Sequence, residues 1–178
     1  MNIRRYSVFT AIVLAASTAL PACAQQRSPQ SVSTTATSEA APAAAAVPAN
    51  NAMPLLVVHK SPYCGCCGLW VEHMHEAGFA VEVRNVANVN PIKQRVGVPL
   101  AKGSCHTAQV GKYFIEGHVP AGDVKRLLAE QPDAKGLVVP GMPKGSPGME
   151  VPDGSIDAYT VELVANDGST SVFAQHGE

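Results

Sequence analysis

The chain has 178 residues, of which 46% are hydrophobic and 15% are charged, and its formal net charge at pH 7 is −1. A nearly neutral chain without a cluster of basic residues lacks the usual means of holding nucleic acid, so we expect no nucleic-acid partner. The uncharged apolar runs are too short for an integral membrane domain.

Residues 1–24 have the three-part pattern of a secretory signal peptide. Arg4 and Arg5 precede an apolar stretch over residues 8–20, and small residues follow before Gln25. Two processing routes fit this pattern. In the first, cleavage follows an A-x-A site before Gln25; in the second, a lipoprotein cleavage box, from which the proline at position 21 departs, makes Cys23 a lipid anchor.

Residues 25–54 consist mainly of Ala, Ser, Thr, Pro and Gln and contain no aromatic residue. Such a composition cannot bury a core, so this segment is predicted to be a disordered linker. The remainder, residues 55–178, has the size of one compact domain. We therefore expect a signal peptide, a linker and a single folded domain.

Hydrophobic periodicity and turn residues predict the elements of this domain. In chain order they are a buried strand over 55–60, a helix over 68–76, a half-buried strand over 79–86, a short helix over 91–96, a strand over about 107–116, a helix from about 120 to 130, and a β-hairpin of strands 158–165 and 170–176. This alternation indicates an α/β, thioredoxin-like domain with a C-terminal β-hairpin extension.

Three of the five cysteines, Cys64, Cys66 and Cys67, lie where the first strand gives way to the first helix. A fourth, Cys105, is followed directly by His106. Thiolates this close repel one another unless protons, a disulfide or cations neutralise them, and Cu(I) is a cation that thiolates favour. The start of a helix also stabilises a thiolate. This pattern predicts copper or thiol chemistry at the segment.

A larger set of motifs makes the domain recognisable. In chain order they are Cys64–Cys67, Trp70, His73, Gly78–Phe79, Ser104–Ala108, Glu116–Pro120 and Pro140–Met149. With these motifs, residues 55–178 resemble the CopG-like copper-resistance, metal-binding proteins of bacteria. The resemblance implies a thioredoxin-like fold, a periplasmic location, Cu(I) held by cysteines, and other periplasmic copper-resistance proteins as partners. It also implies that Cys105 lies near the other three cysteines.

The predicted metal ligands are therefore Cys64, Cys66, Cys67 and Cys105. Four thiolates would leave a site with one Cu(I) strongly anionic, whereas several bridged Cu(I) ions would approach neutrality. We predict a multinuclear Cu(I) cluster on this ground.

Methionine and histidine are the candidates that would complete the site. Met142 and Met149 lie in a loop rich in glycine and proline, and we expect one of them to be a ligand rather than a packing residue. His106 and His118 are further candidates. Their alternatives are structural, because neighbouring strand residues such as Cys105 and His106 point to opposite faces, and His118 precedes a turn.

Two side chains of the first predicted helix are expected to support the site rather than bind metal. His73 lies about 10 Å along the helix axis from Cys66, too far to reach the same ion, so a structural role is predicted. Trp70, one turn after Cys66, is expected to pack under the site. His59, His75 and His176 are predicted to be ordinary surface or core residues.

Two other functions stay open from the sequence. Cys64 and Cys67 form the C-x-x-C pair of a thiol-disulfide oxidoreductase, although Thr107 and Ala108 stand where such enzymes keep a proline. The four cysteines also match the donor set of a structural zinc site, whose ligands are usually two separated pairs. We expect a copper-binding or redox-handling protein rather than an enzyme that turns over a substrate.

Overall fold

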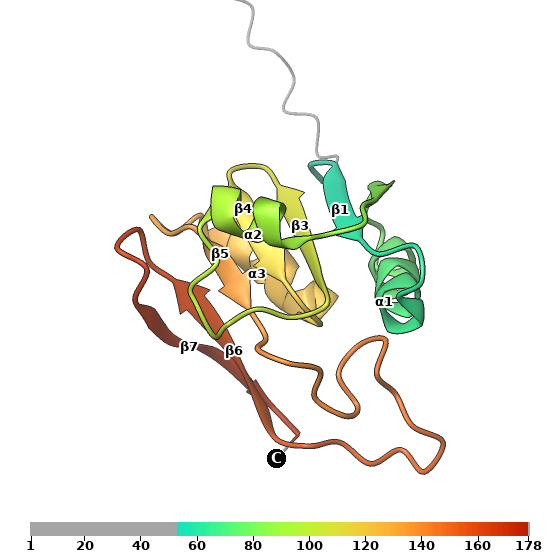
Figure 1. The fold of residues 1–178 in the computed structure, drawn as a ribbon. Coiled ribbons are helices and arrows are strands. Elements are labelled where there is room, and N and C mark those ends of the chain that lie inside the picture. The colour runs from blue at the N-terminus through green and yellow to red at the C-terminus, as the bar shows by residue number, and fades with distance from the viewer. Residues whose placement is uncertain (1–52, 178) are drawn as a thin grey trace, which may run out of the picture. The chain divides into compact units, whose positions relative to one another are not determined.

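The computed structural model describes residues 53–177, in which seven strands form one mixed sheet and three helices pack against it (Figure 1). The elements are β1 (Leu56–Lys60), α1 (Gly65–Glu76), β2 (Val81–Asn85), α2 (Asn90–Val96), β3 (His106–Val110), β4 (Tyr113–Glu116), α3 (Ala121–Glu130), β5 (Gly136–Val138), β6 (Tyr159–Val164) and β7 (Thr170–His176). The mixed α/β class predicted from the sequence is confirmed. The predicted signal peptide and nearly all of the predicted linker lie outside the described residues.

The strand order in the sheet is β2-β1-β3-β4-β5-β6-β7. β1 runs parallel to β2, and β4 runs parallel to β5, whereas the other neighbours are antiparallel. Lys60, the last residue of β1, pairs with His106, the first residue of β3. The start of α1 and the segment before β3 therefore meet at one end of the sheet, although about forty residues separate them in the chain.

The two faces of the sheet are covered by different helices. Ile115 of β4 belongs to the main core, together with residues of α1 and α3. Its neighbour Phe114 points to the other face and packs in a smaller cluster with Val96, the last residue of α2. This alternation is the two-residue period of a strand, and it places α1 and α3 on one face and α2 on the other.

The ends of α1 and α2 coincide with residues whose backbone geometry suits a helix boundary. α1 follows Cys64, which has extended backbone geometry, and the chain then turns at Gly78 with a φ of +91°. α2 has a proline in its first turn and ends at Gly97 in the left-handed conformation. Among residues 53–177, no helix combines the length and the apolar character needed to cross a bilayer.

Two sequence predictions about the strands were wrong. The strand expected over 107–116 is two strands, β3 and β4, which turn at Gly111 with a φ of +56°. A glycine between two apolar runs is the usual signal of such a tight turn. β2 is largely exposed rather than half-buried, because it lies at the edge of the sheet and pairs with β1 alone.

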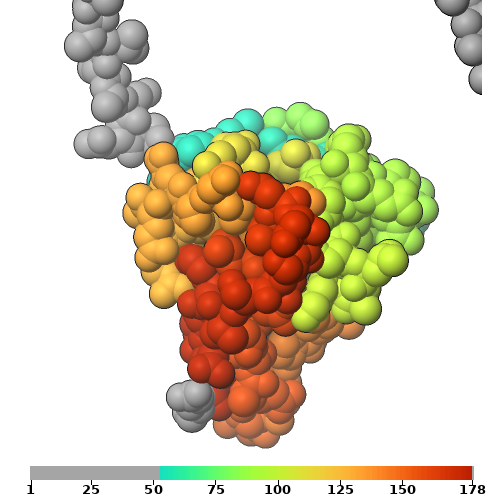
Figure 2. Space-filling view, turned by 90° about the vertical axis from the view of Figure 1, so that its left-hand side faces the viewer, coloured from blue at the N-terminus to red at the C-terminus, as the bar shows by residue number. Residues whose placement is uncertain are grey.

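The strand β5 was missed because it has only three residues inside a segment rich in glycine and proline. Gly136 permits it, since a Cβ there would lie 2.0 Å from the carbonyl oxygen of Phe114. β5 pairs on its other side with the C-terminal hairpin, β6 and β7, which confirms the predicted hairpin. In the space-filling view this hairpin, in red, forms the surface next to the green α2 region (Figure 2).

Candidate metal centre

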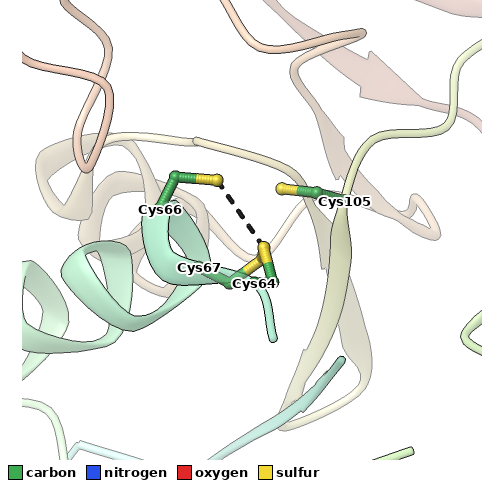
Figure 3. A group of neighbouring side chains, drawn as sticks. All are labelled: Cys64, Cys66, Cys67 and Cys105. Atoms are coloured by element: carbon green, nitrogen blue, oxygen red, sulfur yellow. Dashed lines mark hydrogen bonds between the residues drawn. A yellow bond between two sulfur atoms is a disulfide. The ribbon is translucent and has the colours of Figure 1, made fainter. Parts of the chain in front are cut away.

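The four cysteines of the domain gather at the end of the sheet where α1 begins. Cys64 caps α1, Cys66 and Cys67 lie in its first turn, and Cys105 immediately precedes β3. The four sulfur atoms all lie within 4.8 Å of one another. Figure 3 shows Cys105 pointing toward the three sulfurs of α1 from the opposite side. The structure thus places the four predicted cysteine ligands together.

Two of these cysteines are joined and two are free. Cys64 and Cys67 form a disulfide across the C-x-x-C spacing, with their Cα atoms 5.3 Å apart. Cys66 and Cys105 are free, and the Cys66 sulfur lies 3.6 Å from that of Cys64. Reduction of the disulfide makes all four sulfurs available as donors. In the oxidised state the same atoms can take part in thiol-disulfide exchange.

The Cys105 thiol has an unusual protonation equilibrium. Burial, together with the nearby charge of Cys66, raises the pKa of Cys105 to about 11. For this thiol, the effect of burial outweighs any stabilisation of the thiolate by the nearby start of α1. At neutral pH Cys105 is therefore a thiol, and a metal ion that binds it must displace a proton.

His118 is oriented as metal-binding histidines are. Its Nδ1 lies 2.8 Å from the carbonyl oxygen of Pro147 and must donate to it, since a carbonyl can only accept. The lone pair is then on Nε2, which lies 3.0 Å from the Cys105 sulfur. Burial lowers the pKa of His118, so the imidazole stays neutral and keeps its lone pair.

His106 lies beside the same sulfur and is fully buried. Its Nδ1 lies 3.3 Å from the Cys105 sulfur, and its Nε2 has no hydrogen-bond partner among the described residues. The sulfur of Cys105 and one nitrogen each of His106 and His118 lie within 4.8 Å of one another. Burial and the neighbouring His118 hold the pKa of His106 well below its usual range.

The argument that alternation would separate Cys105 from His106 was wrong. Alternation applies within a strand, and β3 begins at His106, so Cys105 lies outside the strand. Its side chain is free to turn toward the ring that follows it. Cys105 consequently belongs to both groups of donors, the sulfur group and the histidine group.

Trp70 packs under the site, as the sequence predicts. It is fully buried, its ring centroid lies 4.4 Å from that of His106, and its Nε1–H donates to the carbonyl oxygen of Val119 at 2.9 Å. His73, one turn further along α1, accepts a hydrogen bond from the backbone N–H of Ala121 at 3.1 Å. His73 thus caps α3, which is the structural role predicted for it.

The two candidate methionines differ in their surroundings. Met142 has 53% of its surface exposed, whereas Met149 is half-buried. Met149 follows Gly148, and a Cβ on Gly148 would lie only 2.6 Å from the carbonyl oxygen of Cys66. The loop over 140–149 therefore rests against the first turn of α1 at its Met149 end.

The remaining histidines lie away from the cluster or have other partners. His59 is buried in β1, and His75 is exposed on α1. His176 lies at the end of β7, where its Nε2 is 2.7 Å from a carboxylate oxygen of Asp123. No metal donor group includes any of the three among the described residues.

The sequence analysis missed residues that surround Cys105. Glu116 is fully buried and contacts Lys93, and its carboxylate also accepts a hydrogen bond from the backbone N–H of Ser104. Glu116 stands in one of the motifs noted from the sequence, just before Gly117. A glutamate in an apolar strand, two residues before a candidate ligand, was the available signal.

Comparisons with known proteins add the family. Residues 102–149 match the family described as "Protein of unknown function, DUF411". No curated protein matches the chain. Two solved structures are similar to the chain. "Copper resistance protein copG- Form 1" is 43% identical, with a TM-score of 0.67, and the match covers 71% of this chain and 99% of that one. "Copper resistance protein copG- Form 2" is 44% identical, with a TM-score of 0.66, and the match covers 70% of this chain and 98% of that one. With relatives this similar over nearly their whole length, the chain belongs to the CopG family of copper resistance proteins.

Proposed function

We propose that this protein is exported and binds Cu(I) in copper resistance, holding several ions in one cysteine-bridged cluster. The observation that carries the proposal is the set of four cysteine sulfurs within 4.8 Å of one another. Thiolate sulfur is a soft donor that suits Cu(I). Membership of the CopG family supports copper as the metal.

The charge of the site supports more than one ion. Reduction and metal binding would place four thiolate charges in a site where Cys67 is buried and the other three cysteines are partly buried. Unneutralised charge is costly there because burial removes hydration. One Cu(I) would neutralise a quarter of the charge, whereas several ions bridged by the sulfurs would neutralise most of it.

We assign further ligands by the direction of their donor atoms. His118 comes first, since its Nε2 lone pair faces the Cys105 sulfur and its Nδ1–H is fixed by Pro147. His106 follows, because its Nδ1 lies 3.3 Å from the same sulfur. Of the two methionines, Met149 is the better candidate because its loop end rests against α1, whereas Met142 is exposed.

We also propose that the fold is thioredoxin-like and that the protein resides in the periplasm. The order β2-β1-β3-β4, with α1 joining the parallel pair β1 and β2 and α3 following β4, supports the fold. The signal-peptide pattern at residues 1–24 supports export, with either a soluble product or a lipid anchor at Cys23.

Thiol-disulfide exchange is the second candidate function. The disulfide between Cys64 and Cys67 at the start of α1 favours it. In that function, the reduced pair would transfer two electrons to a substrate disulfide, forming the Cys64–Cys67 bond and releasing two substrate thiols. The free sulfur of Cys66, 3.6 Å from Cys64, opposes it because a third thiol invites wrong pairing.

Anaerobic titration of the reduced protein with Cu(I), read by native mass spectrometry, tests the proposal. We expect several copper ions per chain, and fewer in Cys66→Ser and Cys105→Ser. His75→Ala is the control, since His75 is exposed and outside both donor groups. Unchanged copper content in both cysteine variants would contradict the cluster. Absence of copper, together with reduction of oxidised glutathione by Cys64 and Cys67, would favour the second function.

A further inference from the structure

A buried ion pair lies directly behind Cys105. Lys93 of α2 contacts Glu116 of β4, and their side chains are 11% and 0% exposed. Of the ion pairs formed within residues 53–177, this one is the most buried. It lies on the α2 face of the sheet, because Glu116 alternates with Ile115 of the main core.

The pair binds the chain on both sides of Cys105. Glu116 Oε1 accepts the backbone N–H of Ser104 at 2.5 Å, and Oε2 accepts the hydroxyl of Thr107 at 2.7 Å. Lys93 Nζ donates to the Thr107 hydroxyl oxygen at 3.0 Å and to the carbonyl oxygen of His106 at 3.4 Å. Every residue from Ser104 to Thr107 except Cys105 therefore has an atom bound by the pair.

These contacts complement those on the opposite face. The His106 ring packs at a tilt against Trp70 on the α1 side, while Thr107 and the His106 carbonyl are held from the α2 side. Cys105 itself touches neither Lys93 nor Glu116 in these hydrogen bonds. These hydrogen bonds reach the Cys105 sulfur through the backbone that carries it.

A gain in stability does not account well for such a pair. Burying two charges costs hydration, and apolar side chains of similar size often serve a fold as well. A charged pair does supply several directed hydrogen bonds at once, which fix the position of a segment. The chain from residue 99 to residue 105 needs this, because it belongs to no helix or strand.

We propose that Lys93 and Glu116 are positioning residues that hold Cys105 and His106 against the cysteines of α1. This inference rests on the proposed copper function for its consequence, but the positioning itself belongs to the metal-free protein. Without the pair, the Ser104–Thr107 segment loses its anchor, and the Cys105 sulfur no longer stays within reach of the other three.

The test replaces both charges, so that neither is left buried and unpaired. In the double variant Lys93→Met/Glu116→Leu, the copper-free, reduced protein should alkylate at Cys105 about tenfold faster, the scale of a lost hydrogen bond or two. Under competition with a Cu(I) chelator, it should hold copper about tenfold more weakly. Peptide mass spectrometry measures alkylation at each cysteine, so a change at Cys105 is read separately from any change at the other three.

Two further variants keep the result interpretable. Glu82→Leu/Arg84→Met removes an exposed ion pair of β2 by the same substitutions and should change neither readout. Thr107→Val leaves both charges in place and removes only their hydrogen bonds to the Thr107 hydroxyl, so it should shift Cys105 alkylation in the same direction and by less. If the double variant does not fold, Cys105 alkylation in Thr107→Val tests the inference instead.

Unchanged alkylation at Cys105 in a folded double variant, as judged by circular dichroism, would overturn the inference. If the double variant does not fold, unchanged alkylation in Thr107→Val would do the same. Failure of the parent protein to bind copper would overturn the proposed function alone, because alkylation is measured without metal.

Discussion

Replacing Gly148 by alanine should separate the 140–149 loop from α1 and disturb the candidate metal centre. Gly148 has a φ of +83°, and its Cβ would lie 2.6 Å from the Cys66 carbonyl oxygen and 2.7 Å from the Trp70 backbone nitrogen. Both obstacles are backbone atoms of a helix, so the loop must move. Gly154 is the matched control, with a φ of +68° and nothing within 4 Å of the Cβ position.

The magnitude follows from these two environments. Left-handed geometry costs an alanine about 1–2 kcal/mol, and the stiffer unfolded chain returns about 0.4–1 kcal/mol, so Gly154→Ala should lose about 1 kcal/mol. Gly148→Ala adds the displacement of Pro147, whose carbonyl oxygen accepts the Nδ1–H of His118 at 2.8 Å. Leaving that buried donor unpaired costs a further 1–3 kcal/mol or so, giving about 3 kcal/mol in total.

Urea unfolding of both variants measures the difference in free energy, and Cu(I) competition measures the effect on the site. Gly148→Ala should be less stable than Gly154→Ala by about 2 kcal/mol and should bind copper more weakly, because His118 loses its orientation. Equal stability and equal copper binding in the two variants would refute the packing of this loop against α1.

Further predictions concern Trp70, His73 and the Cys64–Cys67 disulfide. Trp70→Phe should lower the free energy of unfolding by about 2–3 kcal/mol in urea, because the buried Val119 carbonyl oxygen loses its donor. His73→Ala should lower the free energy of unfolding by about 1 kcal/mol, because α3 loses the cap on the backbone N–H of Ala121. His73→Gln can still accept this hydrogen bond and should be destabilised less. Burial lowers the pKa of His73, so below pH about 6.5 the unfolded chain binds more protons at this residue than the folded chain does. The free energy of unfolding should therefore fall as the pH drops below that value. In urea unfolding from pH 5 to 7, this free energy should depend less on pH in His73→Gln than in the parent protein. Protein kept without reductant should bind less copper in titrations than reduced protein, because the Cys64–Cys67 disulfide withdraws two of the four sulfurs, and equal binding would contradict this.

The sequence was sufficient to locate the cysteine segment because its signals are local. An apolar run predicts β1, a helical pattern predicts α1, and the cysteines lie where the chain passes from one to the other, from the N-cap of α1 into its first turn. The turn at Gly111 and the short strand β5 were not predicted. The glycine between two apolar runs was a signal for the first that the prediction of one strand overlooked, and the three residues of β5 carry too little pattern.

The surroundings of Cys105 were predictable only in part. Its approach to the α1 cysteines was expected from the family resemblance rather than from the residues. The ion pair of Lys93 and Glu116 was not predicted, because charged residues are usually exposed. The two residues are 23 positions apart in the chain and meet only because α2 packs against β4. Spacing along a chain does not encode such a contact.

The candidate centre therefore consists of two halves with different properties. The half around Cys105 is held by buried contacts: Trp70 against the His106 ring, Pro147 on His118, and Glu116 on the Ser104 backbone. The half at the start of α1 can change its oxidation state, since Cys64 and Cys67 form a disulfide. A metal that bound to the reduced site would meet donors of the first half already in place, which would lower the ordering cost of binding. The oxidation state of the second half would then set how many sulfurs are available to the metal, so under the proposed function metal binding and thiol oxidation would compete for the same atoms.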